Sequence, residues 1–192
     1  MIVKALQKLK SFGFEPKKIL DIGANKGKWT LEIRKKVFPD SDFILIEAIA
    51  YKELEKLSMK YDNINFKNIL LDEKERQVTW YEKRNTGDSL FRENTGYFED
   101  CKELVKNTST LDLTFNDSNL FELIKIDCQG AEIPILKGGK NLVQNATVII
   151  LEVPFMGEYN IGAPNFYEHM QYMENIGYRV FDIVELHRVD NI

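Results

Sequence analysis

The chain has 192 residues, enough for one ordinary domain with a full hydrophobic core. Its 26 basic and 30 acidic side chains give a net charge of −4, which argues against nucleic acid and anionic membranes as partners. A membrane-spanning helix needs about 20 apolar residues, and the apolar stretches here are much shorter, so we expect no membrane span. Cys101 and Cys128 fit neither a metal-binding spacing nor a disulfide framework, which favours a cytoplasmic protein.

Helical and strand-like segments alternate along the chain. Residues 1–14 carry lysines and apolar residues at helical spacing and predict an N-terminal amphipathic helix instead of a signal peptide. Further helices are expected at residues 29–37, 51–61 and 166–176. Strands are expected at residues 19–22, 43–46, 64–71, 77–82, 120–127, 148–153 and 178–186. The alternation predicts the α/β class, with a mostly parallel sheet and helices on both faces.

Two stretches between these elements differ in composition. Residues 83–98 are rich in Asn, Thr, Gly, Asp and Ser, and residues 155–165 contain glycines and a proline. Long loops in compact domains are often functional, and parallel sheets bind ligands at the carboxyl ends of their strands. We therefore expect a single domain over residues 1–192, in which 83–98 and 155–165 are active-site loops.

The segment after the first predicted strand reads Asp21-Ile22-Gly23-Ala24-Asn25-Lys26-Gly27. Gly23 would allow a tight turn and the close approach of a ligand to the backbone. Gly27 would open a helix whose free N–H groups favour a carboxylate or phosphate. The spacing differs from the dinucleotide fingerprint G-x-G-x-x-G because position 25 is Asn, and it lacks the ending of a phosphate-binding loop. A generic strand-turn-helix is the alternative interpretation.

Acidic residues follow the next two predicted strands. A carboxylate at Glu47 can accept two hydrogen bonds from a ribose diol, and a helix N-terminal charge is the alternative. The third strand runs into Leu71 and Asp72, where the edge of an adenine would lie. Asp72 is either an acceptor for the adenine amino group or an exposed loop acid. The glycine turn one strand earlier favours the ribose role for Glu47.

A later strand carries opposite charges on one face. Lys125 and Asp127 are two residues apart in an apolar segment, so their side chains lie on the same side of a strand. Burying two charges is costly unless they are paired, which favours a functional site. A structural ion pair that locks the sheet is the alternative. Glu152 ends the following apolar strand in the same way.

Several motifs follow one another in a characteristic order. They are Leu20-Asp21-Ile22-Gly23-Ala24-Asn25, Thr110-Leu111-Asp112, Lys125-x-Asp127-x-x-Gly130-Ala131-Glu132, Leu136-Lys137-Gly138-Gly139 and the strand that ends in Glu152. In this order and spacing the chain resembles the FkbM-type S-adenosylmethionine-dependent methyltransferases over residues 19–186. The motif that begins at Lys125 is the most specific part of the match.

The resemblance implies a Rossmann-like methyltransferase fold with an antiparallel last strand, S-adenosylmethionine as cofactor, and O-methylation of a hydroxyl on a sugar, glycan or small natural product. A hydroxyl is a poor nucleophile while protonated, so a base within hydrogen-bond reach would help, and our candidates are Asp127 and Glu152, with Lys125 orienting or tuning Asp127. No cluster of carboxylates and amides demands a metal, although Asp127 could join one. The cofactor-binding residues that we expect are Asp21, Gly23, Ala24, Asn25, Gly27, Glu47, Ala48, Leu71, Asp72 and Asp127.

Three features depart from the family pattern. Residue 129 is Gln where the family often has Glu, which leaves a neutral side chain by the acceptor. Residue 48 is Ala where many members have Pro. The family normally has one more strand after residues 178–186, so the sequence either is a piece of a longer protein or leaves a sheet edge open.

Two other function classes remain open from the sequence. One is a non-catalytic module that binds a nucleotide or S-adenosylmethionine. The other is an NAD-dependent dehydrogenase, which Asn25 disfavours. The expected partner is a small-molecule or carbohydrate acceptor, and an open edge at residues 178–186 would favour a homodimer, because exposed strand edges recruit further strands.

Overall fold

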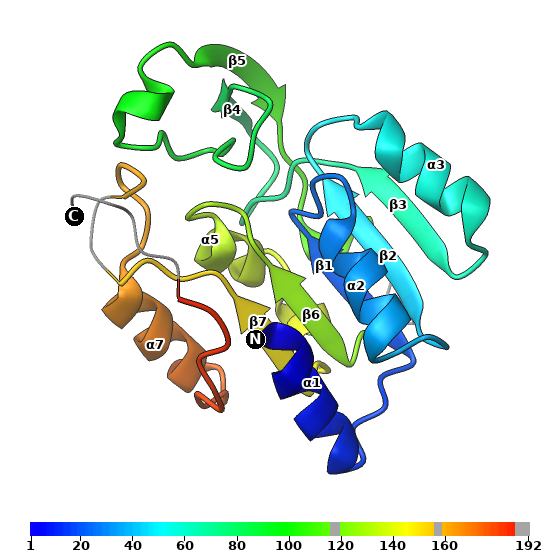
Figure 1. Cartoon of the computed structure of the whole chain (residues 1–192). Helices are drawn as coiled ribbons and strands as arrows, with labels where there is room; N and C mark the ends of the chain where they lie inside the picture. Colours follow the sequence, from blue (N-terminus) through cyan, green and yellow to red (C-terminus); the bar gives the residue numbers. More distant parts are fainter. Residues whose placement is uncertain (116–119, 156–158, 187–192) are drawn as a thin grey trace.

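The computed structural model describes residues 1–115, 120–155 and 159–186. Its centre is a five-stranded parallel sheet with the strand order β3-β2-β1-β6-β7 (Figure 1). The strands are β1 (Lys18–Ile22), β2 (Asp42–Glu47), β3 (Ile64–Asn68), β6 (Leu123–Ile126) and β7 (Val148–Leu151). The strand order reverses between β1 and β6, which is where ligands bind in open α/β sheets. The predicted α/β class and mostly parallel sheet are confirmed.

Helices cover both faces of this sheet. One face carries α1 (Ile2–Ser11), α2 (Lys28–Lys36) and α3 (Lys52–Lys60), and the other carries α4 (Leu111–Thr114), α5 (Glu132–Lys137) and α6 (Lys140–Val143). The last helix, α7 (Phe166–Asn175), packs on the second face through Tyr172 and Met173. None of the described helices has the length and apolar character that crossing a bilayer requires.

The strands are apolar because both of their faces are buried. Leu20 and Ile22 of β1 join the hydrophobic cluster under α4, α5 and α6, whereas Ile19 joins the cluster under α1, α2 and α3. Side chains alternate along a strand, so Asp21 shares the face of Ile19. This placement puts a carboxylate inside the protein, and a partner for it is required there.

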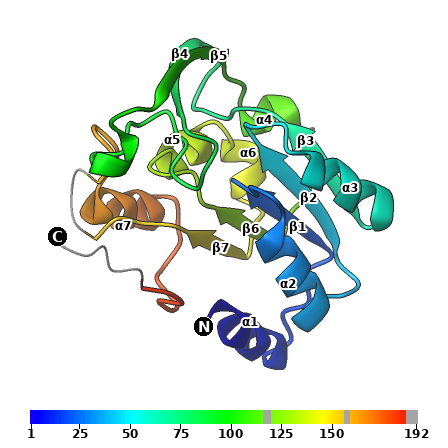
Figure 2. The same ribbon diagram turned by 45° about the horizontal axis from the view of Figure 1, so that its top comes forward.

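A second, two-stranded sheet lies outside the main one (Figure 2). It pairs β4 (Gln77–Glu82) with β5 (Lys102–Asn107) in antiparallel fashion, and a short 3₁₀ helix, η1 (Gly96–Phe98), lies between them in sequence. The sequence predicted β4 but not β5. Most side chains of β5 are exposed, so its sequence lacks the alternation that indicates a half-buried strand.

The predicted last strand at residues 178–186 is wrong. This segment has no strand structure, and Val180, Phe181 and Ile183 are all more than half exposed. It is attached by side chains instead, because the Tyr178 hydroxyl lies 2.6 Å from the carbonyl oxygens of both Val143 and Ala146. A strand forms only where a neighbour pairs with its backbone, and apolar composition alone did not supply that neighbour.

Candidate functional site

The carboxyl ends of four neighbouring strands meet at one edge of the sheet. Gly23 follows β1, Glu47 ends β2, Asp127 follows β6 and Glu152 follows β7. The Glu152 N–H donates to the Ile126 carbonyl at 3.0 Å, which continues the register of the sheet past the end of β7. All four residues line one cleft of about 2000 Å³.

The turn after β1 is shaped by its glycines. Gly23 has a φ of 75°, and a Cβ at this position would overlap the backbone carbonyl of Asp127. Gly27 has a φ of 76° and a Cβ there would overlap Leu57. Gly27 is also the N-cap of α2, and no side chain caps this helix end. The turn therefore brings bare backbone and the positive end of α2 close to the cleft.

Glu47 is bound to the same turn. Its two carboxylate oxygens accept hydrogen bonds from the N–H groups of Asn25 at 2.7 Å and Ile49 at 3.0 Å. Burial raises the pKa of Glu47, and the hydrogen bonds from these amides partly offset the effect. Each carboxylate oxygen can accept a further hydrogen bond, so the side chain can still receive a diol from the cleft.

Seven of the predicted cofactor residues line the cleft: Gly23, Ala24, Asn25, Glu47, Ala48, Leu71 and Asp127. The other three do not line it: Asp21, Gly27 and Asp72. Asp72 is fully buried, and its carboxylate accepts hydrogen bonds from Arg76 Nε at 2.6 Å and from the Glu73 N–H at 2.7 Å. The structure thus gives Asp72 local partners away from the cleft.

The β4–β5 hairpin supplies an apolar wall beside Glu47. Trp80 packs with Ile49 and Leu70 in a small cluster of buried side chains, and all three line the cleft. Lys106 of β5 donates to the carbonyl of Ala48 at 3.1 Å, which fixes the hairpin to the loop after β2. A flat apolar ring system would find a matching surface here.

Lys125 is the centre of a buried charge network. It is the register partner of Asp21, and its Nζ lies 3.4 Å from Asp21 Oδ1 and 3.1 Å from Asp127 Oδ2. Thr30 donates to the other Asp21 oxygen at 2.6 Å. Burial alone would lower the pKa of Lys125, but the carboxylates of Asp21 and Asp127 raise it above its ordinary value. Lys125 therefore stays charged and fixes Asp127 at the cleft.

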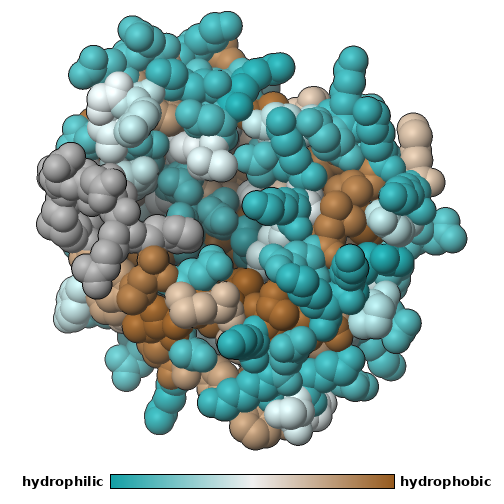
Figure 3. Space-filling view, in the orientation of Figure 1, coloured by the Kyte–Doolittle hydropathy of each residue, from teal (hydrophilic) through white to brown (hydrophobic). Residues whose placement is uncertain are grey.

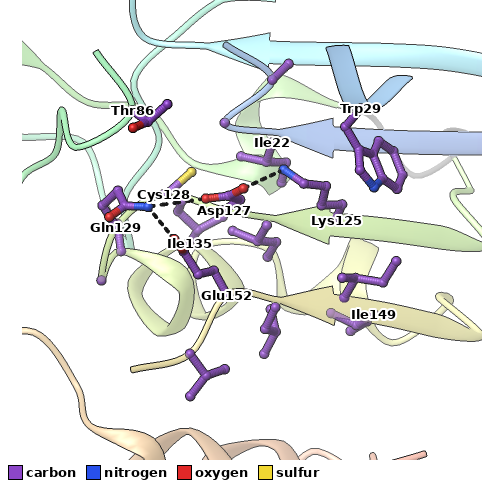
Figure 4. Close-up of a pocket in the computed structure, with 18 of the residues that line it drawn as sticks. Ile22, Trp29, Thr86, Lys125, Asp127, Cys128, Gln129, Ile135, Ile149 and Glu152 are labelled. Atoms are coloured by element: carbon purple, nitrogen blue, oxygen red, sulfur yellow. Dashed lines mark hydrogen bonds and ion pairs between the residues drawn. The ribbon is translucent and has the colours of Figure 1, made fainter. Parts of the chain in front are cut away.

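Asp127 also belongs to a pair of carboxyl groups. Figure 4 shows the Gln129 side chain between Asp127 and Glu152, and its Nε2 donates to Asp127 Oδ1 at 3.4 Å and to Glu152 Oε2. Burial favours the neutral form of Asp127, but Lys125 holds its pKa below the usual value. Desolvation and the Asp127 carboxylate raise the pKa of Glu152. One proton is therefore retained preferentially on the Glu152 side of the pair.

The two predicted loops are joined to each other over this pair. An antiparallel bridge connects Glu93 with Asn160, and the Ile161 N–H donates to Arg92 at 2.8 Å. The Asn160 amide donates to the carbonyl of Phe91 at 3.0 Å. Loop residues 83–98 and the described part of the second loop, 159–165, therefore form one connected wall. Residues 156–158 of the predicted loop lie outside the described part of the chain.

The sequence did not single out several residues at the site. Tyr159 and Asn160 line the cleft, and Ser89 lies behind it against the turn after β6. All three lie in irregular segments, where no periodicity indicates which side chains turn inward. Burial and, to a smaller extent, the Glu93 carboxylate raise the pKa of Tyr159 to about 12, and this contact joins two segments far apart in the sequence. Within the described ranges, no group of three or more His, Cys, Asp or Glu side chains is placed to hold a metal ion.

A reversing parallel sheet, a glycine turn and an acid at the end of β2 define a nucleotide-type cofactor-binding domain of the α/β class. Residues 21–180 match the Methyltransferase FkbM domain. The chain belongs to this family, as its motifs predicted. Among curated proteins, no sequence matches this chain.

The solved structures that are similar to this chain include methyltransferases. The plantazolicin methyltransferase BpumL in complex with SAH is 13% identical with a TM-score of 0.51, and the match covers 91% of this chain and 61% of that one. Another BpumL structure holds SAH and a pentazolic desmethylPZN analog; it is 14% identical with a TM-score of 0.44, and the match covers 79% of this chain and 47% of that one. A protein from Nostoc punctiforme PCC 73102, proposed to be an O-methyltransferase, is 12% identical with a TM-score of 0.47. That match covers 94% of this chain and 51% of the Nostoc protein. The chain therefore spans about half to three fifths of these proteins.

Proposed function

We propose that this protein is an S-adenosylmethionine-dependent methyltransferase that methylates a hydroxyl group of a sugar, glycan or small natural product. The observation that carries the proposal is the Asp127–Gln129–Glu152 cluster, which lines the same cleft as the glycine turn and Glu47. A cofactor cradle and a pair of carboxyl groups that can hold a proton are thus within one site. Family membership supports the same activity.

The cleft has the features that S-adenosylmethionine requires. The turn at Gly23 and the uncapped end of α2 accept the carboxylate of its amino acid part, and Glu47 accepts the ribose diol. The apolar surface of Ile49, Leu70 and Leu71 receives the adenine. Adenosine recognition therefore uses the end of β2 and the apolar cluster of Ile49 and Leu70, which Trp80 of β4 completes.

The chemistry that the cofactor supplies is a methyl group on a cationic sulfonium. The residues of this chain hold the acceptor oxygen in line with that methyl group, and positioning of this kind contributes about 7–11 kcal/mol. The proton of the acceptor hydroxyl passes to a carboxylate oxygen of the Asp127–Glu152 pair. Lys125 keeps Asp127 ionised and in place, so Asp127 is the first candidate for the base.

The connected wall of loops 83–98 and 159–165 encloses the acceptor and excludes water. Bound acceptor would lie between this wall and the carboxyl pair, since Glu93, Asn94, Tyr159 and Asn160 line the same cleft as Glu152. Side chains there offer both donors and acceptors, which suits a hydroxylated molecule.

The first experiment is a calorimetric titration with S-adenosylhomocysteine and, separately, with NAD. We expect saturable binding of S-adenosylhomocysteine and none of NAD. The second experiment offers labelled S-adenosylmethionine with a panel of sugars and hydroxylated natural products, and we expect label in an ether product. Binding without transfer to any acceptor would support the non-catalytic module, and binding of NAD alone would support the dehydrogenase.

The sequence predicted a homodimer through a strand at residues 178–186. We propose that a homodimer forms instead through the free edge of β7. Among the described residues, β7 pairs with β6 and with no strand on its other side, whereas residues 178–186 form no strand. Hydrophobic surface also lies on the side of the molecule where α7, β7 and α1 adjoin (Figure 3). A second copy would pair along β7, and light scattering at increasing protein concentration tests this arrangement.

A further inference from the structure

Ser89 lies at the junction between the loop wall and the turn that carries the carboxyl pair. The residue is 1% exposed, and its backbone pairs with Tyr81 of β4 through two hydrogen bonds of 2.9 and 3.2 Å. Its position is thus fixed by the β4–β5 hairpin and not by the loop alone. The backbone pairing with Tyr81 therefore also fixes the contacts that the Ser89 side chain makes.

The Ser89 hydroxyl points at the turn after β6. Its Oγ lies 3.1 Å from the carbonyl oxygen of Cys128 and 2.9 Å from that of Gln129, and it accepts the N–H of Phe91 at 3.1 Å. A hydroxyl has one proton and two lone pairs, so these contacts use its donor and an acceptor. Among the described residues, Ser89 is the residue of loop 83–98 whose side chain forms hydrogen bonds with this turn.

The turn needs such a partner because its backbone is strained. Gln129 has a φ of 53°, in the left-handed region that non-glycine residues rarely adopt. Such conformations persist only where the surroundings hold them, and they cluster at functional sites. In this conformation the Gln129 side chain reaches both Asp127 and Glu152.

We propose that Ser89 is a positioning residue: its buried hydroxyl holds the left-handed turn at Gln129 and thereby keeps the Gln129 amide between Asp127 and Glu152. Ser89 touches neither cofactor nor acceptor in this role. Its catalytic meaning rests on the proposed methyltransferase function, whereas the positioning itself can be measured without an acceptor. Ser89 then connects the β4–β5 hairpin and loop 83–98 with the Asp127–Glu152 pair.

The proposal predicts a change in the titration of the carboxyl pair. A donated hydrogen bond favours the ionised form of a carboxyl group, so loss of the Gln129 amide raises the lower apparent pKa of the pair. Other groups that act on the pair are Lys125, Glu132, Cys128 and Tyr159, and none of them is altered. The difference between variants therefore reports the contact of Ser89 with the turn.

The test is ¹³C NMR titration of the side-chain carboxyl groups in the whole protein, assigned with Asp127→Asn and Glu152→Gln. We expect Ser89→Ala to raise the lower apparent pKa by about one unit, the scale of one charge-assisted hydrogen bond. Gln129→Ala should give the same rise, and the double variant should add nothing further, because Ser89 acts through Gln129. An unchanged titration in Ser89→Ala, or a rise that adds to that of Gln129→Ala, overturns the proposal.

Ser41→Ala is the matched control. Ser41 is also a buried serine, 4% exposed, whose hydroxyl donates to the Pro16 carbonyl at 2.5 Å, and it does not line the cleft. It should lower thermal stability without moving the titration, and an equal shift in this variant also overturns the proposal. If Ser89→Ala does not fold, Ser89→Cys provides a weaker donor of similar size; a smaller rise supports the proposal and no rise overturns it. Wild-type titration with S-adenosylhomocysteine tests the proposed function separately.

Discussion

The cleft has two halves that are built differently. In the strand-end half, Gly23 and Asn25 follow β1 and Glu47 ends the adjacent strand β2, and hydrogen bonds from backbone N–H groups hold them in place. In the loop half, residues 83–98 and 159–165 come from distant parts of the chain and are joined by one β-bridge and a few side-chain contacts. The first half is fixed by the sheet, and the second half by contacts between loops.

This difference explains which properties of the protein are easy to infer. A local motif carries the strand-end half, so it is common to a family and identifies the class of cofactor. The loop half depends on long-range contacts, and loops vary more than the elements that they connect. Variants in the two halves should therefore fail in different ways.

The largest effect is expected from Gly23→Ala. The added Cβ would overlap the Asp127 carbonyl, between β1 and β6, so the free energy of unfolding should fall by more than about 3 kcal/mol. Gly162→Ala is the control from the loop half, since Gly162 has a φ of 77° but no atom within 4 Å of its Cβ position. It should cost only about 1 kcal/mol. Urea unfolding measures both, and equal losses would remove the distinction between the halves.

Asp127→Asn should lower turnover by about 10²-fold or more, because a general base typically contributes this much. Affinity for S-adenosylhomocysteine should stay close to that of the wild type. Asp112→Asn is the control, since Asp112 is an acid outside the cleft that accepts the N–H groups of Asn141 and Leu142. A wild-type rate in Asp127→Asn would place the base elsewhere, with Glu152 as the next candidate.

Glu47→Ala should weaken S-adenosylhomocysteine binding by about 10- to 100-fold, the scale of one or two charge-assisted hydrogen bonds. Glu53→Ala serves as the control because Glu53 is an exposed acid paired with Lys26, close to the same turn. Calorimetry gives both affinities. Equal affinities of Glu47→Ala and wild type for S-adenosylhomocysteine would show that Glu47 does not bind the ribose.

The pH dependence of stability should change in Glu152→Gln. The pKa of Glu152 is raised by desolvation and by Asp127, so the folded chain holds this proton more tightly than the unfolded chain. Its contribution to stability is therefore lost as the pH rises from about 4.3, the ordinary Glu value, toward the folded pKa. Because Glu152 faces the open cleft, we expect a shift of only a few degrees in Tm. Parallel Tm profiles of wild type and Glu152→Gln from pH 5 to 9 would contradict the raised pKa.

The smallest effect on binding is expected from Asp72→Asn. The Asp72 carboxylate is occupied by Arg76 and lies outside the cleft, so the variant should lose stability and keep its affinity for S-adenosylhomocysteine. The sequence predicted a contact between Asp72 and the adenine. A tenfold loss of affinity in Asp72→Asn would restore that prediction and contradict the placement seen here.

The amino-acid sequence by itself determined the class of fold and the strand-end half of the cleft. Apolar runs such as those around Leu20 and Ile124 have a local physical cause, since a strand buried on both faces must be apolar. Gly23 and Glu47 could be placed because each directly follows a strand predicted from the sequence. The family resemblance rested on the same short segments.

Only the tertiary structure decided the rest. It paired β5 with β4 and left residues 178–186 without strand structure, because pairing depends on which backbone is available nearby. It turned Asp72 away from the cleft and gave Lys125 two carboxylate partners, Asp21 and Asp127. It also brought Ser89 onto the turn at Gln129, 40 residues further along the chain. Contacts of this kind depend on how distant segments pack together, and neither periodicity nor a local motif records that.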